Sequence, residues 1–159
     1  MVSSGTEETV CRLVREYSGL LLRLACARLD SVSDAEDAVQ EVFLRLLASP
    51  VVFRDAGHEK AWLIRATLHR TSDIRRRTEN RNVPLEEAVQ TAAPDEGSEL
   101  LNAVRALPEK YGAPIHLHYY EGYTIREIGK LLGLPAATVG TRLARGRERL
   151  RQMLKEEEL

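Results

Sequence analysis

The segment from residue 124 to residue 151 constrains the fold more than any other part of the chain. Thr124 and Glu127 have the spacing of a capping box, in which the two side chains bond to free backbone N–H groups at the start of a helix. Gly133 accepts the left-handed backbone conformation that ends such a helix, and Pro135 suits the first turn of the next one. The segment therefore predicts two helices joined by a tight turn, a helix-turn-helix.

The remaining sequence also favours helices. Aromatic residues make up only 5% of the 159 residues, whereas strands are rich in aromatic and β-branched residues. The clearest helix spans residues 33–48, where Ser33 and Glu36 fit a second capping box and apolar residues recur at helical spacing: Val39, Val42, Phe43, Leu46 and Leu47. Further helices are expected at 5–30, with a break at Ser18-Gly19, and at about 59–78.

Residues 80–97 divide the chain. They contain Pro84, Pro94 and Gly97 and are rich in acidic side chains, a composition typical of a linker. We expect an all-α protein of two small helical domains, at 1–79 and 98–159, joined by a flexible linker. In the second domain, short helices at 98–106 and 108–120 would precede the helix-turn-helix.

The charge distribution points to nucleic acid, although the net charge is only −1. Basic residues dominate the C-terminal helix, where residues 140–155 carry six Lys and Arg side chains and Glu148 as the only acid. A basic stripe of this kind suits a phosphate backbone. The exposed face of the second helix of the motif predicts contacts with base edges and phosphates in a major groove, from Ala137, Thr138, Thr141, Arg142 and Arg145.

Signatures of catalysis are missing from the sequence. It has no phosphate-binding glycine loop and no nucleophile or zinc motif, and His116 and His118 are two residues apart, on different faces of a helix. We therefore expect no enzyme, no cofactor and no metal. The sequence also has no signal peptide and no apolar run near the roughly 20 residues that span a bilayer, so we expect a cytoplasmic protein.

Three segments resemble one family in order and spacing. Residues 107–154, LPEKYGAPIHLHYYEGYTIREIGKLLGLPAATVGTRLARGRERLRQML, look like region 4 of an extracytoplasmic-function (ECF, group IV) sigma factor of the sigma-70 family. DAEDAVQEVFLRLL, at 34–47, resembles region 2.2, and AWLIRATLHRTSDIRRR, at 61–77, resembles regions 2.3 to 2.4. The resemblance implies a factor that binds core RNA polymerase and directs promoter-specific transcription initiation.

The family implies a role for each segment. Asp37, Gln40 and Glu41 would dock on core polymerase. The loop 49–58 and the following helix would melt and read the −10 element, with strand contacts from Arg65, His69, Arg75, Arg76 and Arg77, and the C-terminal motif would grip the −35 duplex. An anti-sigma factor is the expected regulatory partner. Two positions depart from the family pattern: Leu68-His69 stands where many members have Arg-Asn, and Gly140 stands where a Lys is frequent.

Two other interpretations are open at this point. A stand-alone helix-turn-helix regulator would use the same C-terminal motif without polymerase, usually as a dimer on a palindrome. A helical bundle that binds only proteins would leave Arg142 and Arg145 without a role in DNA binding.

Overall fold

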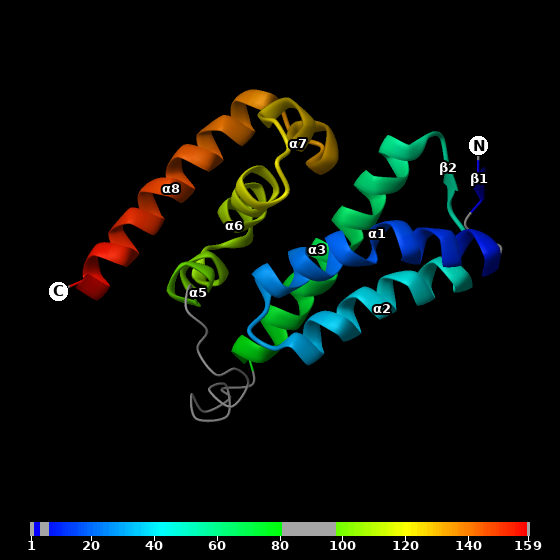
Figure 1. Ribbon diagram of the computed structural model, residues 1–159, viewed down its shortest axis with the longest axis horizontal. Helices are drawn as coiled ribbons and strands as arrows, with labels where there is room; N and C mark the ends of the chain where they lie inside the picture. The colour runs from blue at the N-terminus through cyan, green and yellow to red at the C-terminus, as the bar shows by residue number, and fades with distance from the viewer. Residues whose placement is uncertain (1, 4–6, 81–97, 159) are drawn as a thin grey trace.

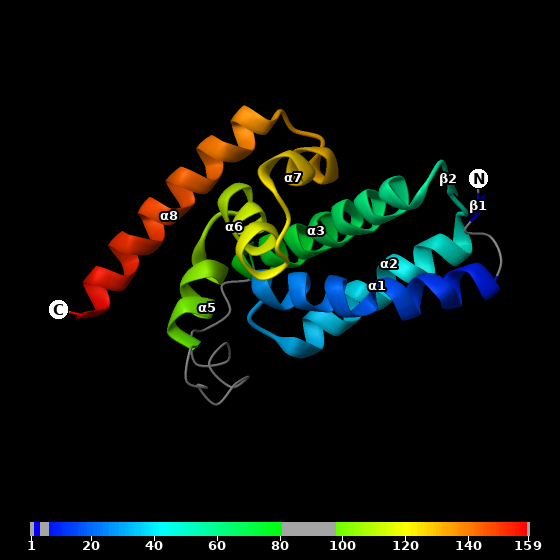
Figure 2. The ribbon, with the colours of Figure 1, turned by 45° about the horizontal axis from the view of Figure 1, so that its top comes forward.

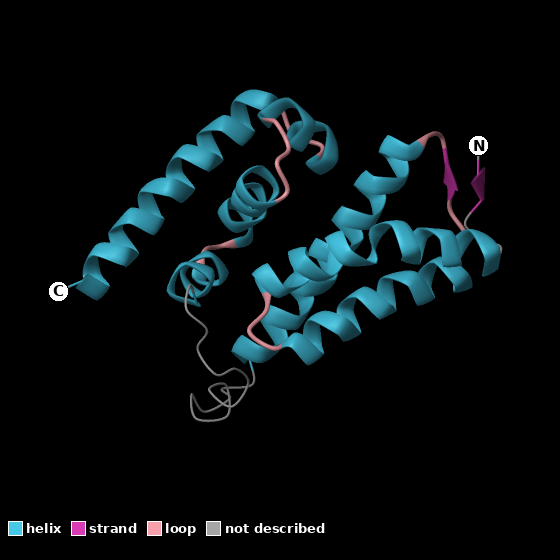
Figure 3. Ribbon diagram, viewed as in Figure 1, coloured by secondary structure: helices cyan, strands magenta, loops and turns pink. Residues whose placement is uncertain are grey.

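Helices form almost all of the computed structural model, which describes residues 2–3, 7–80 and 98–158 (Figures 1 and 3). The N-terminal helices are α1 (Glu7–Arg28), α2 (Val32–Ala48) and α3 (Ala56–Asn80). The C-terminal helices are α5 (Ser98–Ala106), α6 (Glu109–Ile115), the π-helical turn η2 (His116–Tyr120), α7 (Ile125–Leu132) and α8 (Ala136–Glu158). The predicted all-α class is confirmed, apart from one two-residue antiparallel pair, β1 (Val2–Ser3) with β2 (Val52–Phe53).

The N-terminal helices pack around a core of aliphatic side chains. Leu13, Leu21 and Leu24 of α1 are fully buried, as are Leu63 and Ile64 of α3. The predicted break at Ser18-Gly19 is wrong, because α1 runs through it without interruption. A glycine inside a helix costs about 1 kcal/mol, and burial of the flanking apolar side chains outweighs that cost.

The start of α2 also differs from the prediction. Ser31, not Ser33, is the N-cap, and its side chain accepts a hydrogen bond from the N–H of Asp34 at 3.2 Å. Both serines precede the same apolar pattern, so sequence spacing alone does not separate them.

A polar cluster joins the start of α3 to α1. Glu59 is 4% exposed and accepts hydrogen bonds from Arg12, at 2.8 and 3.2 Å, and from the Tyr17 hydroxyl, at 3.1 Å. A buried carboxylate requires such partners. Burial and the bond to Glu59 raise the pKa of Tyr17 to about 12.

The helix-turn-helix has the local features that its sequence predicts. The capping box of α7 is complete: the N–H of Glu127 donates to the Thr124 hydroxyl at 3.1 Å, and the N–H of Thr124 donates to the Glu127 carboxylate at 3.0 Å. Gly133 follows in the left-handed conformation, at φ 70°. At Gly129, a Cβ atom would lie 2.7 Å from the carbonyl oxygen of Leu134, so the turn closes only over a glycine.

The N-terminal and C-terminal helices pack against each other (Figure 2). The main contacts join α3 to α7 and α1 to α5 and α6. Most of the predicted linker, residues 81–97, lies outside the described residues. Asn80, which we assigned to the linker, is the last residue of α3.

Candidate nucleic-acid interface

The five residues predicted for duplex recognition line one open groove. Ala137, Thr138, Thr141, Arg142 and Arg145 surround a volume of about 390 Å³ together with Lys110 and Tyr111 of α6. α8 holds this face outward because Val139 and Leu143, on its opposite side, are buried. The helix also approaches α6 closely at Gly146, where a Cβ atom would lie 3.1 Å from Ile115. The structure therefore brings the predicted set together.

Sequence reasoning missed the wall that α6 adds to this groove. Lys110 is exposed, and its ammonium group lies 5.1 Å from the centre of the Tyr111 ring. The Arg149 guanidinium lies 4.7 Å from the same ring. Tyr111 is 5% exposed, so it serves as a fixed support between two cations. Only the packing of α6 on α8 reveals this arrangement, since about 30 residues separate the two walls in sequence.

The five residues predicted for the −10 strand divide into two groups along α3. Arg65 and His69 are exposed, one turn apart, and line a shallow groove of about 250 Å³ with Trp62. Arg75, Arg76 and Arg77 lie at the other end of the helix, about 15 Å from Arg65 by the helical rise. Arg76 pairs with Asp73, and Arg77 is exposed. The structure thus joins the first two residues and separates them from the arginine run.

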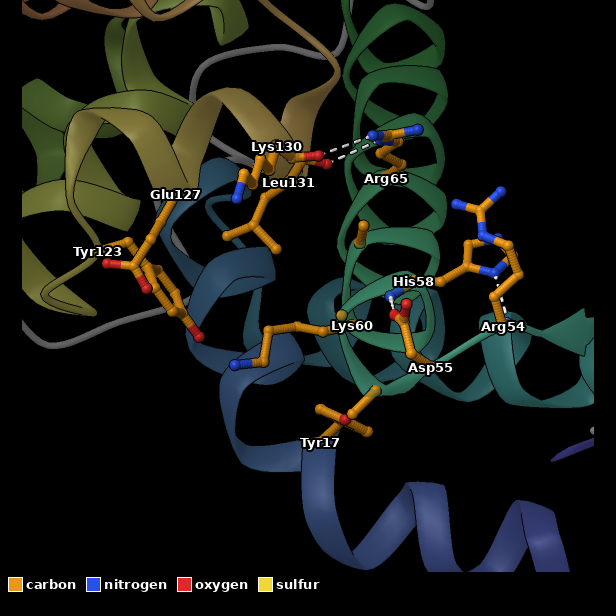
Figure 4. Close-up of a pocket in the computed structure, with 13 residues that line it drawn as sticks. Tyr17, Arg54, Asp55, His58, Lys60, Arg65, Tyr123, Glu127, Lys130 and Leu131 are labelled. Atoms are coloured by element: carbon orange, nitrogen blue, oxygen red, sulfur yellow. Dashed lines mark hydrogen bonds between the residues drawn. The ribbon is translucent and has the colours of Figure 1, made fainter. Parts of the chain in front are cut away.

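Two of these arginines contact the C-terminal helices. The Arg65 guanidinium donates to the carbonyl oxygens of Leu131, at 2.7 Å, and Lys130, at 3.0 Å, at the end of α7 (Figure 4). Arg75 donates to the carbonyl oxygen of Leu107 at 3.4 Å.

A larger pocket of about 780 Å³ lies between the start of α3 and α7 (Figure 4). Its cationic lining residues include Arg54, Lys60 and Lys130, which sequence reasoning did not single out. The Lys60 ammonium lies 5.1 Å from the centre of the Tyr123 ring. The acidic residues of the lining are engaged locally, since Asp55 accepts from the N–H of His58 at 2.8 Å and Glu127 completes the capping box. The pocket is therefore cationic and aromatic in character.

The predicted docking residues share one face of α2. Asp37 and Gln40 are exposed, while Glu41 is half-buried and pairs with Arg70 of α3. Leu44 and Leu47 are 55% and 43% exposed close to the same face. Leu47 recurs at the helical spacing of the apolar residues, yet it is exposed, because Leu46 alone fills the inward position there. The result is a mixed acidic and apolar surface of the kind that protein interfaces use.

Metal-ligand clusters and membrane-spanning helices are both missing from the described part of the chain. No group of three or more possible metal ligands occurs among these residues. None of the described helices combines the length and apolar character needed to cross a membrane.

Family models match both halves of the chain. The model for sigma-70 region 2 matches residues 13–82, and the model for sigma-70 region 4 matches residues 98–150. The ECF RNA polymerase sigma factor SigW of Bacillus subtilis is 29% identical, over 98% of this chain and 94% of its own length. SigL of Mycobacterium tuberculosis, also an ECF RNA polymerase sigma factor, is 30% identical over 91% of this chain and 88% of its own length. The chain is an ECF sigma factor of the sigma-70 family.

Solved structures share the fold of this sigma factor. The sigma factor RpoE of Bartonella quintana, in complex with the anti-sigma factor NepR, superposes with a TM-score of 0.67 at 20% identity, over 94% of this chain and 98% of that one. CnrH, in complex with the cytosolic domain of CnrY, gives the same TM-score and identity, over 96% and 92% of the two chains.

The family also determines the general function. An ECF sigma factor directs RNA polymerase to promoters and is not an enzyme. The stand-alone regulator and the protein-only bundle are both set aside, because region 2 and region 4 occur together in the order of the family.

Proposed function

We propose that this sigma factor reads the −35 duplex with the α8 groove, through Ala137, Thr138, Thr141, Arg142 and Arg145. The observation that carries the proposal is that all five line one groove, which small residues open at the N-terminal end and arginines flank further along. Arginine donates two hydrogen bonds to guanine or contacts phosphate, and small side chains permit close approach to base edges. Lys110, on the opposite wall of the groove, would add a cation for the phosphate backbone of the DNA.

Region 2 would carry the other two tasks. Asp37, Gln40 and Glu41, with the exposed Leu44 and Leu47 beside them, would dock on core polymerase. Arg65, His69, Arg75, Arg76 and Arg77 would contact the −10 strand after melting. The region 2 side of the pocket at the start of α3, with Arg54, His58 and Lys60, supports this role, since single strands are held by positive charge and aromatic stacking. We assign these two tasks to a domain at 1–79, and recognition of the −35 element to a domain at 98–159.

An anti-sigma factor is the regulatory partner that we propose. The support is that RpoE and CnrH, which share the fold, were solved in complex with NepR and with the cytosolic domain of CnrY. Docking on polymerase would place the chain in the cytoplasm.

Run-off transcription with core polymerase on a genomic promoter library tests the proposal and reads its specificity. Arg145→Ala should weaken −35 binding by about 1–3 kcal/mol, roughly 5- to 150-fold in affinity, and relax preference at one base position. Arg15→Ala, an exposed arginine of α1 outside the proposed interfaces, is the matched control. If the Arg145→Ala variant bound the selected duplex as tightly as the wild type, the proposal that α8 reads the −35 sequence would be refuted.

A further inference from the structure

Arginines join the two halves of this sigma factor by one repeated contact. Within the described residues, four of them cross between region 2 and region 4 and donate to backbone carbonyl oxygens at or next to helix C-terminal ends. The last carbonyls of a helix have no partner within it and carry the negative end of its dipole. The contacts are Arg28 to Val104 (3.1 Å) and Leu107 (2.7 Å), Arg75 to Leu107 (3.4 Å), Arg65 to Lys130 (3.0 Å) and Leu131 (2.7 Å), and Arg105 to Cys26 (2.7 Å).

Arg28 makes the most deeply buried of these contacts. The arginine is 1% exposed, and its guanidinium lies over Gly112 of α6. A Cβ atom at position 112 would lie 2.0 Å from Nη1 of Arg28 and 2.7 Å from Cζ. The Arg28 guanidinium can therefore keep this position only while residue 112 has no side chain.

The same interface occupies two arginines that we assigned to binding of the −10 strand. Arg65 directs its guanidinium at the end of α7, and Arg75 is half-buried against Leu107. A guanidinium that is bonded to these carbonyls is not available to phosphate or base oxygens. Closure and strand reading thus compete for the same donors.

We propose that the free sigma factor rests in this closed state, with Arg28 over Gly112 as its latch, and that region 4 must separate from region 2 before α3 meets promoter DNA. The masking rests on the proposed −10 role of α3, whereas the latch itself does not.

The chemistry of the latch makes closure reversible. Burial lowers the pKa of Arg28 to about 10, so the buried guanidinium still carries its charge at neutral pH. Among the described residues, its guanidinium donates only to backbone carbonyl groups, and its Nε has no hydrogen-bond partner. Glu109 offsets part of this effect of burial, but Arg28 forms no ion pair among the described residues, and such a buried charge retains much of its desolvation penalty. Binding of region 2 and region 4 to separate surfaces of a larger partner would therefore open the chain readily.

A Gly112→Ala wedge tests the latch in the full-length chain. One fluorophore would be attached at Cys11, which is exposed, and a second at an Arg126→Cys substitution on α7, in a Cys26→Ala background. In the closed state these two sites are near each other. Arg12, beside Cys11, bonds to Glu59, and the next residue, Lys60, lies over the ring of Tyr123, three residues before Arg126. The wedge should lower energy transfer and increase the radius of gyration above the roughly 15 Å of a compact chain of this length.

Controls separate opening from unfolding. Gly140→Ala makes the same change in a helix where nothing lies within 4 Å of the new Cβ atom, so energy transfer should stay at the wild-type value. If the wedge lowers helical content, Arg28→Ala replaces it, with Arg15→Ala as its matched control. Unchanged energy transfer in a folded wedge variant, or an open wild-type chain, overturns the latch.

Binding to a −10 single strand tests the masking. If the open form is 10% or less of the wild type, the wedge should strengthen binding about tenfold or more. An open wedge variant with wild-type strand affinity overturns the masking. In the open Gly112→Ala background, loss of strand affinity on Arg65→Ala supports the proposed −10 role of Arg65, and unchanged affinity refutes it. The energy-transfer result decides the latch in either case.

Discussion

Gly129 provides a sharp test of how the turn of the helix-turn-helix is built. Replacement by alanine would place a Cβ atom 2.7 Å from the carbonyl oxygen of Leu134, whereas ordinary contact begins at 3.4 Å. The obstacle is backbone and has no rotamer by which to move away. The turn would have to shift, and with it the 2.8 Å hydrogen bond from the N–H of Leu134 to the Gly129 carbonyl.

Two opposing effects determine how much Gly129→Ala changes the free energy of unfolding. Alanine is favoured over glycine in a helix interior by up to about 1 kcal/mol. Overpacking in a rigid site costs about 1–3 kcal/mol, and weakening the turn hydrogen bond costs roughly another 1 kcal/mol. We expect a net loss of about 1–3 kcal/mol in the free energy of unfolding. For a chain of this length, each kcal/mol lowers the melting temperature by about 2–4 °C.

Urea unfolding of Gly129→Ala beside Gly140→Ala measures the difference. Position 140 has nothing within 4 Å of the new Cβ atom, so that variant should gain up to about 1 kcal/mol. The two identical substitutions should thus change stability in opposite directions. A Gly129→Ala variant as stable as Gly140→Ala would show that the turn yields freely, and the steric argument would fail.

Two further predictions concern ionisable groups. Glu59→Gln should lower the free energy of unfolding by about 1–3 kcal/mol, because hydrogen bonds to a charged acceptor are lost. The substitution should also move the pKa of Tyr17 from about 12 toward its ordinary 10.0, as ultraviolet titration against Tyr17→Phe would reveal. Burial lowers the pKa of His116 below 6.5, against the opposing effect of Glu121 at 2.9 Å. The unfolded chain therefore takes up a proton near pH 6.5 that the folded chain takes up only at lower pH, so stability should fall as the pH drops from 7.5 to 5.5. His116→Gln should reduce that fall in thermal melts, and an unchanged pH dependence would contradict the assignment to His116.

The features that the sequence predicted correctly depend on nearby residues, although the cap at Ser31 and the unbroken α1 show that local patterns can also mislead. The capping box of α7 and the left-handed glycine involve residues within a few positions of one another, so spacing and residue type determine them. The recognition face of α8 followed from the same reasoning, because the buried Val139 and Leu143 determine which side faces outward.

Features that depend on distant residues could not be predicted. Arg28 meets Gly112 across more than 80 residues, and no local pattern marks a glycine as space for a distant guanidinium. Lys110 joins the α8 groove only through the packing of α6. Leu47 matched the helical period of the core, yet it is exposed because the apolar stripe of α2 is wider than the surface that covers it.

The choice of arginine would explain how one surface could serve both the proposed −10 contact and the proposed closure. A guanidinium has several N–H donors in a planar fork and no acceptor. Phosphate oxygens, guanine acceptors and the free carbonyls at a helix C-terminal end all offer lone pairs with negative charge to such a fork. A helix that presented Arg65 and Arg75 to DNA would therefore also be complementary to the helix ends of its own chain that these arginines contact here. Lysine, a point charge, lacks this bidentate geometry, so Arg65→Lys should weaken closure more than it weakens a non-specific phosphate contact.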